Sequence, residues 1–353
     1  MDRRTLLKAG AVTAGALALP LTDVGAADAV PMVGATLARN LVVPWGIAFL
    51  PSGDALVSSR ISGDIGRVSR HGGRVHVGTV PGVRANGEGG LLGLALSPSF
   101  TTDRWLYAYH TASSDNRIVR MKYVDGKLGR PHLVLAGIPA ADHHNGGRLV
   151  FGPGGLLFAS TGDAGDAGDG ARAQNRRSLG GKILRITPTG GVPSGNPFGN
   201  RVWTMGHRNV EGLSFDANNR LWATEFGEKT RDELNRIVKG ANYGWPNVEG
   251  GDGPGGGYKD PFVTWAPTST CSPSGVAVVN GRAYVGALRG ECLYVVRLDG
   301  PNARHITRYF HGTFGRIRTV QKAPDGSLWI TTSNRDGRGS PASTDDRVIR
   351  IRL

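Results

Sequence analysis

Cysteine, aromatic residues and long apolar runs are all scarce in this chain of 353 residues. The two cysteines, Cys271 and Cys292, exclude a scaffold of several disulfides, so a packed core has to stabilise the fold. In an exported protein one such pair usually forms one disulfide, which two neighbouring strands could hold. Aromatic residues make up 7% of the chain and no block of lysines and arginines accompanies them, so nucleic-acid binding is disfavoured.

The first 29 residues differ in character from the rest of the chain. The pair Arg3-Arg4 precedes an apolar run from Ala9 to Leu19, which is too short to span a membrane, and small residues up to Ala26 follow. This order is typical of a twin-arginine signal peptide, so residues 1–29 are expected to be removed on export to the periplasm or the medium. A retained N-terminal anchor is the alternative. No second hydrophobic segment follows, so no membrane span is expected in the mature chain.

Positive charge exceeds negative charge, with 42 lysines and arginines against 28 aspartates and glutamates and a formal net charge of +14. A field of this sign raises the local concentration of anions. Because the arginines are spread along the whole chain, a solvated basic surface is the simplest interpretation, and an anionic cofactor or partner surface is compatible with it.

Glycine, in contrast, is abundant at 55 residues, and it marks the turns of a repeated pattern. Each copy has an apolar strand, a glycine-containing turn, a second strand, a loop, and a third strand rich in arginine and isoleucine or valine. Turns such as Pro-Ser-Gly-Asp suit hairpins, and no helical period lasts for more than a turn or two. The six copies begin at Pro44, Gly89, Gly146, Asn209, Pro273 and Arg316.

Repeats of about 40–60 residues with several strands each are typical of a propeller. The sequence therefore predicts an all-β fold, a six-bladed β-propeller formed by residues 30–353. The stretch from Thr36 to Val43 is expected to join the last copy as a strand and to close the ring. A β-sandwich is the alternative, but it would not need the repeat. Propellers bind ligands on one face around the central channel, so functional residues should recur at one position of each copy.

The segment from Met205 to Asn247 holds the highest density of functional side chains. Arg208-Asn209 stands before a strand predicted over Gly212 to Phe215, and a second strand is predicted over Arg220 to Glu225. The loop from Gly227 to Glu233 follows with three carboxylates. Oxygen-rich loops suit Ca²⁺, and arginine beside asparagine suits an anionic or carbonyl-rich ligand. A polar hairpin with a surface ion pair is the alternative interpretation.

Histidine and glycine mark three other candidate positions. The pair His143-His144 opens the third copy, and histidine is the natural general base near neutral pH. A metal site at this pair is disfavoured, because no other histidine or cysteine has a ligand-like spacing to it. Glu88 opens the second copy beside glycines that let backbone approach a ligand. The acidic, glycine-rich stretch from Gly162 to Gly170 is interpreted as a loop over the site.

Four arginines from three parts of the repeat are candidates for the channel: Arg316 and Arg318 enter the sixth copy, Arg289 ends a strand of the fifth, and Arg208 precedes the fourth. Arg316 and Arg318 are spaced by one residue, so their side chains point to the same side of a strand. With Arg208 and Arg289 they are expected to converge on the channel. Four uncompensated arginines would repel one another, so the sequence predicts a polyanionic ligand between them.

The motifs HHNGGRLVF, GHRNVEG, EFG-x(4)-DELN, KGANYGWPN and RIRTV occur in this order. Together they resemble the soluble PQQ-dependent aldose sugar dehydrogenases of the glucose/sorbosone dehydrogenase family, over about Asn40 to Leu353. The resemblance implies a six-bladed propeller that oxidises the C1 hydroxyl of aldoses to lactones and passes electrons through PQQ to an external acceptor. A metal-dependent lactone hydrolase and a non-catalytic carbohydrate-binding propeller are the alternatives.

The resemblance also implies roles by position. His144 would take the proton from the anomeric hydroxyl, and Arg208 would stabilise charge developing on the PQQ carbonyl. Contacts to PQQ are implied for Glu88, Arg208, Asn209, Arg289, Arg316 and Arg318.

Two Ca²⁺ sites are implied as well. Backbone carbonyls of Gly227 and Glu228 would hold the catalytic ion, which polarises the quinone. Glu233 and the Tyr243 carbonyl match a second, structural site. Glutamate at position 88, arginine at 289 and glutamate at 228 stand where family members often have glutamine, lysine and proline.

Overall fold

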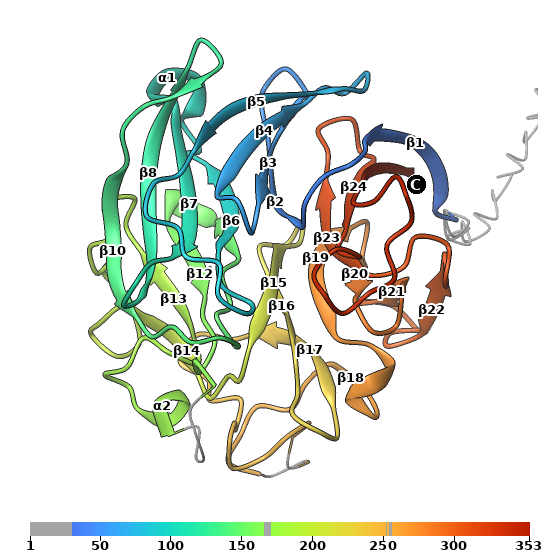
Figure 1. The fold of residues 1–353 in the computed structure, drawn as a ribbon. Coiled ribbons are helices and arrows are strands. Elements are labelled where there is room, and N and C mark those ends of the chain that lie inside the picture. Colours follow the sequence, from blue (N-terminus) through green and yellow to red (C-terminus); the bar gives the residue numbers. More distant parts are fainter. Residues whose placement is uncertain (1–29, 166–170, 252, 254–255) are drawn as a thin grey trace, which may run out of the picture. The chain divides into compact units, whose positions relative to one another are not determined.

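Six antiparallel β-sheets follow one another around a ring in the computed structural model (Figure 1). The structure describes residues 30–165, 171–251, 253 and 256–353, so the predicted signal peptide lies outside it. Each sheet is one blade with its first strand innermost, and the prediction of a six-bladed propeller is confirmed. None of the described helices is long and apolar enough to cross a membrane.

The blades follow the chain in order, and their strands are as follows. Blade 1 contains β2 (Pro44–Phe49), β3 (Ala55–Ser59), β4 (Asp64–Val68) and β5 (Arg74–Thr79), and blade 2 contains β6 (Leu91–Leu96), β7 (Trp105–Thr111), β8 (Asn116–Val124), β9 (Lys127–Leu128) and β10 (His132–Ile138). Blade 3 contains β11 (Leu149–Phe151), β12 (Leu157–Ser160), β13 (Lys182–Ile186) and β14 (Val202–Met205), and blade 4 contains β15 (Val210–Phe215), β16 (Leu221–Glu225), β17 (Asp232–Ile237) and β18 (Val263–Trp265). Blade 5 contains β19 (Pro273–Val279), β20 (Arg282–Ala287), β21 (Cys292–Arg297) and β22 (Ile306–Tyr309), and blade 6 contains β23 (Ile317–Lys322), β24 (Leu328–Thr332), β25 (Val348–Arg352) and β1 (Met32–Ala38). The helical pieces are α1 (Phe100–Asp103), α2 (Ala171–Gln174) and the single turns η1 (Pro153–Gly155) and η2 (Thr268–Thr270).

The ring closes where β1 pairs antiparallel with β25, with Met32 opposite Arg352 and Ala38 opposite Val348. The predicted closing strand is therefore confirmed, but its predicted bounds, Thr36 to Val43, were several residues too late. Asn40 and Val43 have positive φ values of 56° and 47°, which end the extended backbone after Ala38.

The innermost strands approach one another closely, which explains the glycine repeated at their centres. A Cβ added at Gly46 of β2 would lie 2.6 Å from the carbonyl oxygen of Leu92, and one at Gly93 of β6 would lie 2.2 Å from that of Gly147. Any larger residue would push these strands apart. The glycines therefore set the narrow axis around which the functional loops gather.

Cys271 and Cys292 are both buried free thiols in the core between blades 4 and 5, so the expected disulfide is not formed in the structure. Burial raises the pKa of Cys271 well above its ordinary value and that of Cys292 to about 11. Such thiols remain protonated and therefore unreactive, and they pack as small apolar side chains.

Candidate active site

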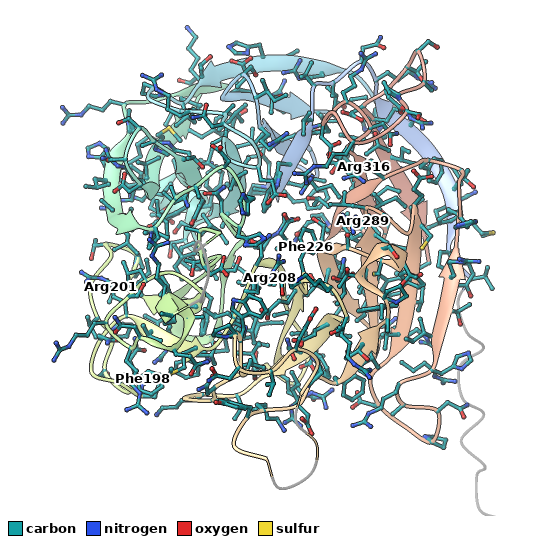
Figure 2. The ribbon with its side chains drawn as sticks, turned by 60° about the horizontal axis from the view of Figure 1, so that its bottom comes forward. Phe198, Arg201, Arg208, Phe226, Arg289 and Arg316 are labelled. Atoms are coloured by element: carbon teal, nitrogen blue, oxygen red, sulfur yellow. The ribbon has the colours of Figure 1, made fainter. Side chains whose placement is uncertain are left out.

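One face of the ring carries the loops that lead into each innermost strand and those that join second strands to third strands. A cavity of about 760 Å³ lies among these loops. Arg208, Phe226, Arg289 and Arg316 surround the centre of the ring, whereas Phe198 and Arg201 lie towards its edge (Figure 2). Of the predicted site residues, the cavity wall includes Glu88, His144, Arg208, Gly227, Glu228, Arg289 and Arg316. Those that do not line it are Asn209, Arg318, Glu233 and Tyr243.

His144 is held by its neighbours in one orientation. Its Nδ1 lies 2.7 Å from Oδ1 of Asp163, which leaves Nε2 as the ring nitrogen without a partner among the described residues. Its backbone has a φ of 57°, and its N–H donates to Oε2 of Glu88 at 3.0 Å. A strained backbone that is held in this way is frequent at functional sites.

Asp163 is a partner of His144 that the sequence did not indicate. Burial would raise its pKa, but hydrogen bonds from His144, from Nε1 of Trp245 at 2.9 Å and from the N–H of Gly165 outweigh burial and lower it. The carboxylate therefore stays ionised beside the imidazole and fixes which ring nitrogen faces the cavity. Residues 166–170 of the predicted loop over the site lie outside the described residues.

Arg208 is positioned by contacts from blade 4. Its guanidinium carbon lies 5.3 Å from the ring centre of Trp245, and one terminal nitrogen donates to the carbonyl of Gly227 at 2.7 Å. Burial lowers the pKa of this arginine, while nearby carboxylates such as Asp163 oppose the shift. Its Nε is buried without a hydrogen-bond partner among the described residues. A planar donor edge is thus available to an oxygen-rich ligand.

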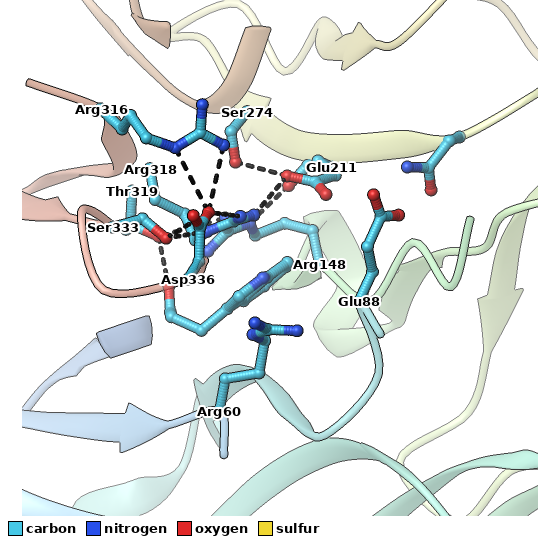
Figure 3. A network of polar contacts seen from close by, with 12 residues as sticks. Arg60, Glu88, Arg148, Glu211, Ser274, Arg316, Arg318, Thr319, Ser333 and Asp336 are labelled. Atoms are coloured by element: carbon cyan, nitrogen blue, oxygen red, sulfur yellow. Dashed lines mark hydrogen bonds and ion pairs between the residues drawn. The ribbon is translucent and has the colours of Figure 1, made fainter. Parts of the chain in front are cut away.

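Arg316 and Arg318 are compensated by carboxylates, so the prediction of four uncompensated arginines was wrong. Arg316 lies 3.1 Å from Asp336, and Arg318 lies 2.9 Å from Glu211 and 3.5 Å from Asp336. Figure 3 shows both guanidinium groups gathered around Asp336. Sequence could not pair Arg318 with Glu211, because 107 positions separate them.

Further arginines fill the axis itself. Arg148 of blade 3 donates to Oγ1 of Thr319 at 3.2 Å in blade 6, which is the opposite blade, and it stacks over Trp45 at 4.1 Å. Burial, followed by the charge of Arg318, lowers the pKa of neighbouring Arg60 to about 10. The cavity is therefore closed on its inner side by a dense, mainly cationic network (Figure 3).

The loop after β16 is fixed by two carboxylates. Consecutive N–H groups from Glu228 to Arg231 all donate to Oε1 of Glu249, at 2.7 to 3.1 Å. The N–H of Gly227 donates to Asp232 at 3.0 Å, and burial raises the pKa of Asp232 to about 7. This bonding leaves the Gly227 and Glu228 backbone on the cavity wall.

A second, much smaller cavity of about 10 Å³ lies behind this loop, with room for about one water molecule or ion. Its wall includes Glu225, Glu233, Tyr243 and Glu249. Burial, followed by the charge of Glu225, raises the pKa of Glu233 to about 8. Buried carboxylates of like charge with oxygen ligands nearby are the arrangement that a hard cation would stabilise.

The remaining predicted residues have different surroundings. Asn209 is buried, its Oδ1 accepts from the N–H of Gly146 at 3.0 Å, and its Nδ2 has no partner among the described residues. Arg289 is exposed on the cavity wall. Glu88 pairs with Arg338 at 2.7 Å, which links blades 2 and 6 across the mouth. Arg338 is a wall residue that the sequence did not indicate.

Comparison with known proteins identifies the relatives of this chain. A profile described as Glucose / Sorbosone dehydrogenase matches residues 41–342. The structure is similar to the PQQ-bound form of aldose sugar dehydrogenase from Streptomyces coelicolor, with a TM-score of 0.86 and 48% identity, covering 91% of this chain and 97% of that one. The chain is also 29% identical to aldose sugar dehydrogenase YliI of Escherichia coli, over 83% of this chain and 88% of the relative. It is 33% identical to quinoprotein glucose dehydrogenase B of Acinetobacter calcoaceticus, over 63% of this chain and 52% of the relative.

Proposed function

Because the chain belongs to the glucose/sorbosone dehydrogenase family, we propose that it oxidises the C1 hydroxyl of aldose sugars to lactones, with PQQ and Ca²⁺ as cofactors. Electrons then pass to an external acceptor. One observation supports this most strongly: the imidazole of His144, oriented by ionised Asp163, and the guanidinium of Arg208 line the same cavity.

The residues of the cavity fit PQQ, which is a quinone with three carboxylates. At about 760 Å³ the cavity has room for such a cofactor and a sugar. Arg208, Arg289 and Arg316 supply guanidinium groups on its wall. Arg208 Nε and Asn209 Nδ2 are buried donors without partners among the described residues, which a ligand rich in oxygen would satisfy. Arg318, which lies off the wall, would act through its contact with Asp336 by keeping Arg316 in place.

Bound PQQ supplies the group that accepts a hydride from the sugar, and Ca²⁺ polarises it. His144 takes the proton of the anomeric hydroxyl at Nε2, because Nδ1 is bonded to Asp163. Asp163 holds the ring in place and stabilises the imidazolium that forms. Arg208 offers its guanidinium to the oxygen on which negative charge develops, an effect that is strong in a water-poor site.

We propose two places for Ca²⁺. The carbonyls of Gly227 and Glu228 would hold the catalytic ion at the cavity wall. Glu233 and the Tyr243 carbonyl would hold a structural ion in the small cavity, where the raised pKa of Glu233 reflects burial and the neighbouring charge of Glu225. We also propose export by the twin-arginine route, through the motif in residues 1–29.

Removal of Ca²⁺ is expected to destabilise the protein. Calcium at about 100 times its Kd would raise the free energy of unfolding by roughly 2.7 kcal/mol, so a chelator should lower Tm by several degrees. In the variant Glu233→Gln this sensitivity should be markedly smaller, because the charged ligand of the structural ion is gone while the proposed site at the cavity wall is unchanged. The control Glu228→Gln keeps the backbone carbonyl and should respond as the wild type does. Equal Tm values with calcium and with chelator in the wild type would contradict the structural site.

Reconstitution tests the function itself. Purified protein is mixed with PQQ and Ca²⁺, and reduction of a neutral dye is followed with glucose and other aldoses. The expected result is sugar-dependent reduction that needs PQQ. Absence of reduction at any cofactor level would overturn the proposal, and sugar binding without turnover would favour a non-catalytic propeller. Lactone hydrolysis under the same conditions would favour the hydrolase.

A further inference from the structure

We propose that the loops around the cavity mouth form a docking face for an acidic electron-carrier protein, which takes the electrons removed from the sugar. This inference rests on the proposed function and adds the class of electron acceptor to it.

The cavity can be approached from its mouth but not along the axis. Arg148, Arg318 and Glu211 are buried on the inner side of the cavity, and Arg148 reaches across the axis to the opposite blade. A partner that needs close approach to the cofactor therefore has to contact the loops of the mouth.

Exposed charge at the mouth is mainly positive. In the described parts of these loops, the exposed carboxylates are Asp142 and Glu228, and Glu228 lies 3.5 Å from Lys229. Arg84 and Arg289 have no ion pair among the described residues. The exposed cations, which come from four different loops around the cavity, include Arg84, Lys229, Arg231, Arg289, Arg335 and Arg338.

The opposite face of the ring is more balanced. Its loops, apart from the long connection that follows β17, expose the cations Arg70, Arg104, Arg130 and Arg304 together with the carboxylates Asp125, Asp299 and Asp325. The net charge of the chain is therefore displayed with a bias towards the mouth. Such a field steers an acidic partner to the cavity and raises its association rate, by roughly 10 to 10³-fold in favourable cases.

The electron balance suits a carrier protein. Each turnover removes two electrons and two protons from the sugar as the C1 hydroxyl becomes a lactone carbonyl. Two molecules of a one-electron carrier take the electrons in succession, and the protons pass to solvent. A weak, salt-sensitive complex that forms and dissociates quickly allows two carrier molecules to be reduced in succession, whereas a tight complex would delay the second.

Two forms of one haem protein test the charge preference. The holoenzyme with glucose is given either native cytochrome c, which is basic, or succinylated cytochrome c, which is acidic and carries the same haem. At low ionic strength the succinylated form is expected to be reduced at least about tenfold faster, and the difference should shrink as salt screens the interaction. Equal rates, or faster reduction of the native form, would overturn the proposal.

Charge-reversal variants locate the face. Arg84→Glu and Arg335→Glu should each slow reduction of the succinylated form several-fold while leaving reduction of a neutral dye unchanged. Arg130→Glu on the opposite face makes the same change in net charge and should leave both rates unchanged. An equal loss in Arg130→Glu would show that only net charge matters and would refute the docking face. If even the neutral dye is not reduced by the wild type, the proposed function has failed instead.

Discussion

Replacing His144 with alanine is expected to lower turnover by about 10²–10⁴-fold while PQQ remains bound. The variant loses the base at the cavity wall, whereas the guanidinium groups proposed to hold the cofactor come from other loops. Turnover is measured with a neutral dye and saturating glucose, and PQQ binding is measured separately by titration of the metal-loaded protein.

The adjacent histidine provides the matched control. His143 also lines the cavity, and its ring lies edge-on to that of His144 with 4.7 Å between centroids, but no carboxylate orients it in the described part of the chain. His143→Ala should therefore cost far less turnover than His144→Ala. Similar losses in both variants would mean that the assigned base is wrong, and near-normal turnover in His144→Ala would exclude it.

The inner three strands of each blade could be predicted from sequence, whereas the outer strands of blades 1 to 5 could not. The first three strands of each copy combine buried apolar residues with glycine turns, as in β2 and β3. Two of the fourth strands are different: β5 is largely exposed, and β22 has no fully buried residue. A strand that packs on one neighbour and otherwise contacts water carries little hydrophobic pattern, so the repeat identified three strands per blade. The one fourth strand that was predicted, in blade 6, was given bounds several residues too late.

The sequence indicated single residues that line the cavity, but it did not indicate the pairs of residues that hold them in place. His144 and Arg208 stand in recognisable motifs at the start of blades, and both line the cavity. Their partners are set only by folding: Asp163 meets Trp245 over 82 positions, and Glu88 meets Arg338 over 250. Carboxylates paired with arginines in this way neutralise much of the positive charge at the axis. Counting the arginines alone therefore overstated the need for an anionic ligand.

Replacing Arg208 with lysine is expected to lower turnover by about 10²–10³-fold, although the charge is conserved. A guanidinium can donate to the Gly227 carbonyl with one nitrogen and still present Nε and its other nitrogen to a ligand. The ammonium of lysine is a compact charge without the planar set of N–H donors of a guanidinium. It could therefore bind either the Gly227 carbonyl or the ligand, but not both.

The kinetic pattern distinguishes this role from simple attraction of an anion. If Arg208 stabilises charge that develops during hydride transfer, the lysine variant should lose kcat while PQQ affinity changes much less. Arg201→Lys, at the edge of the ring, should leave both quantities unchanged (Figure 2). A variant that binds PQQ poorly but turns over normally at saturating cofactor would show that Arg208 holds the cofactor without taking part in its reduction. Electrostatic stabilisation of the reaction would then have to come from another group on the cavity wall, with Arg289 and Arg316 as the cations in place to supply it.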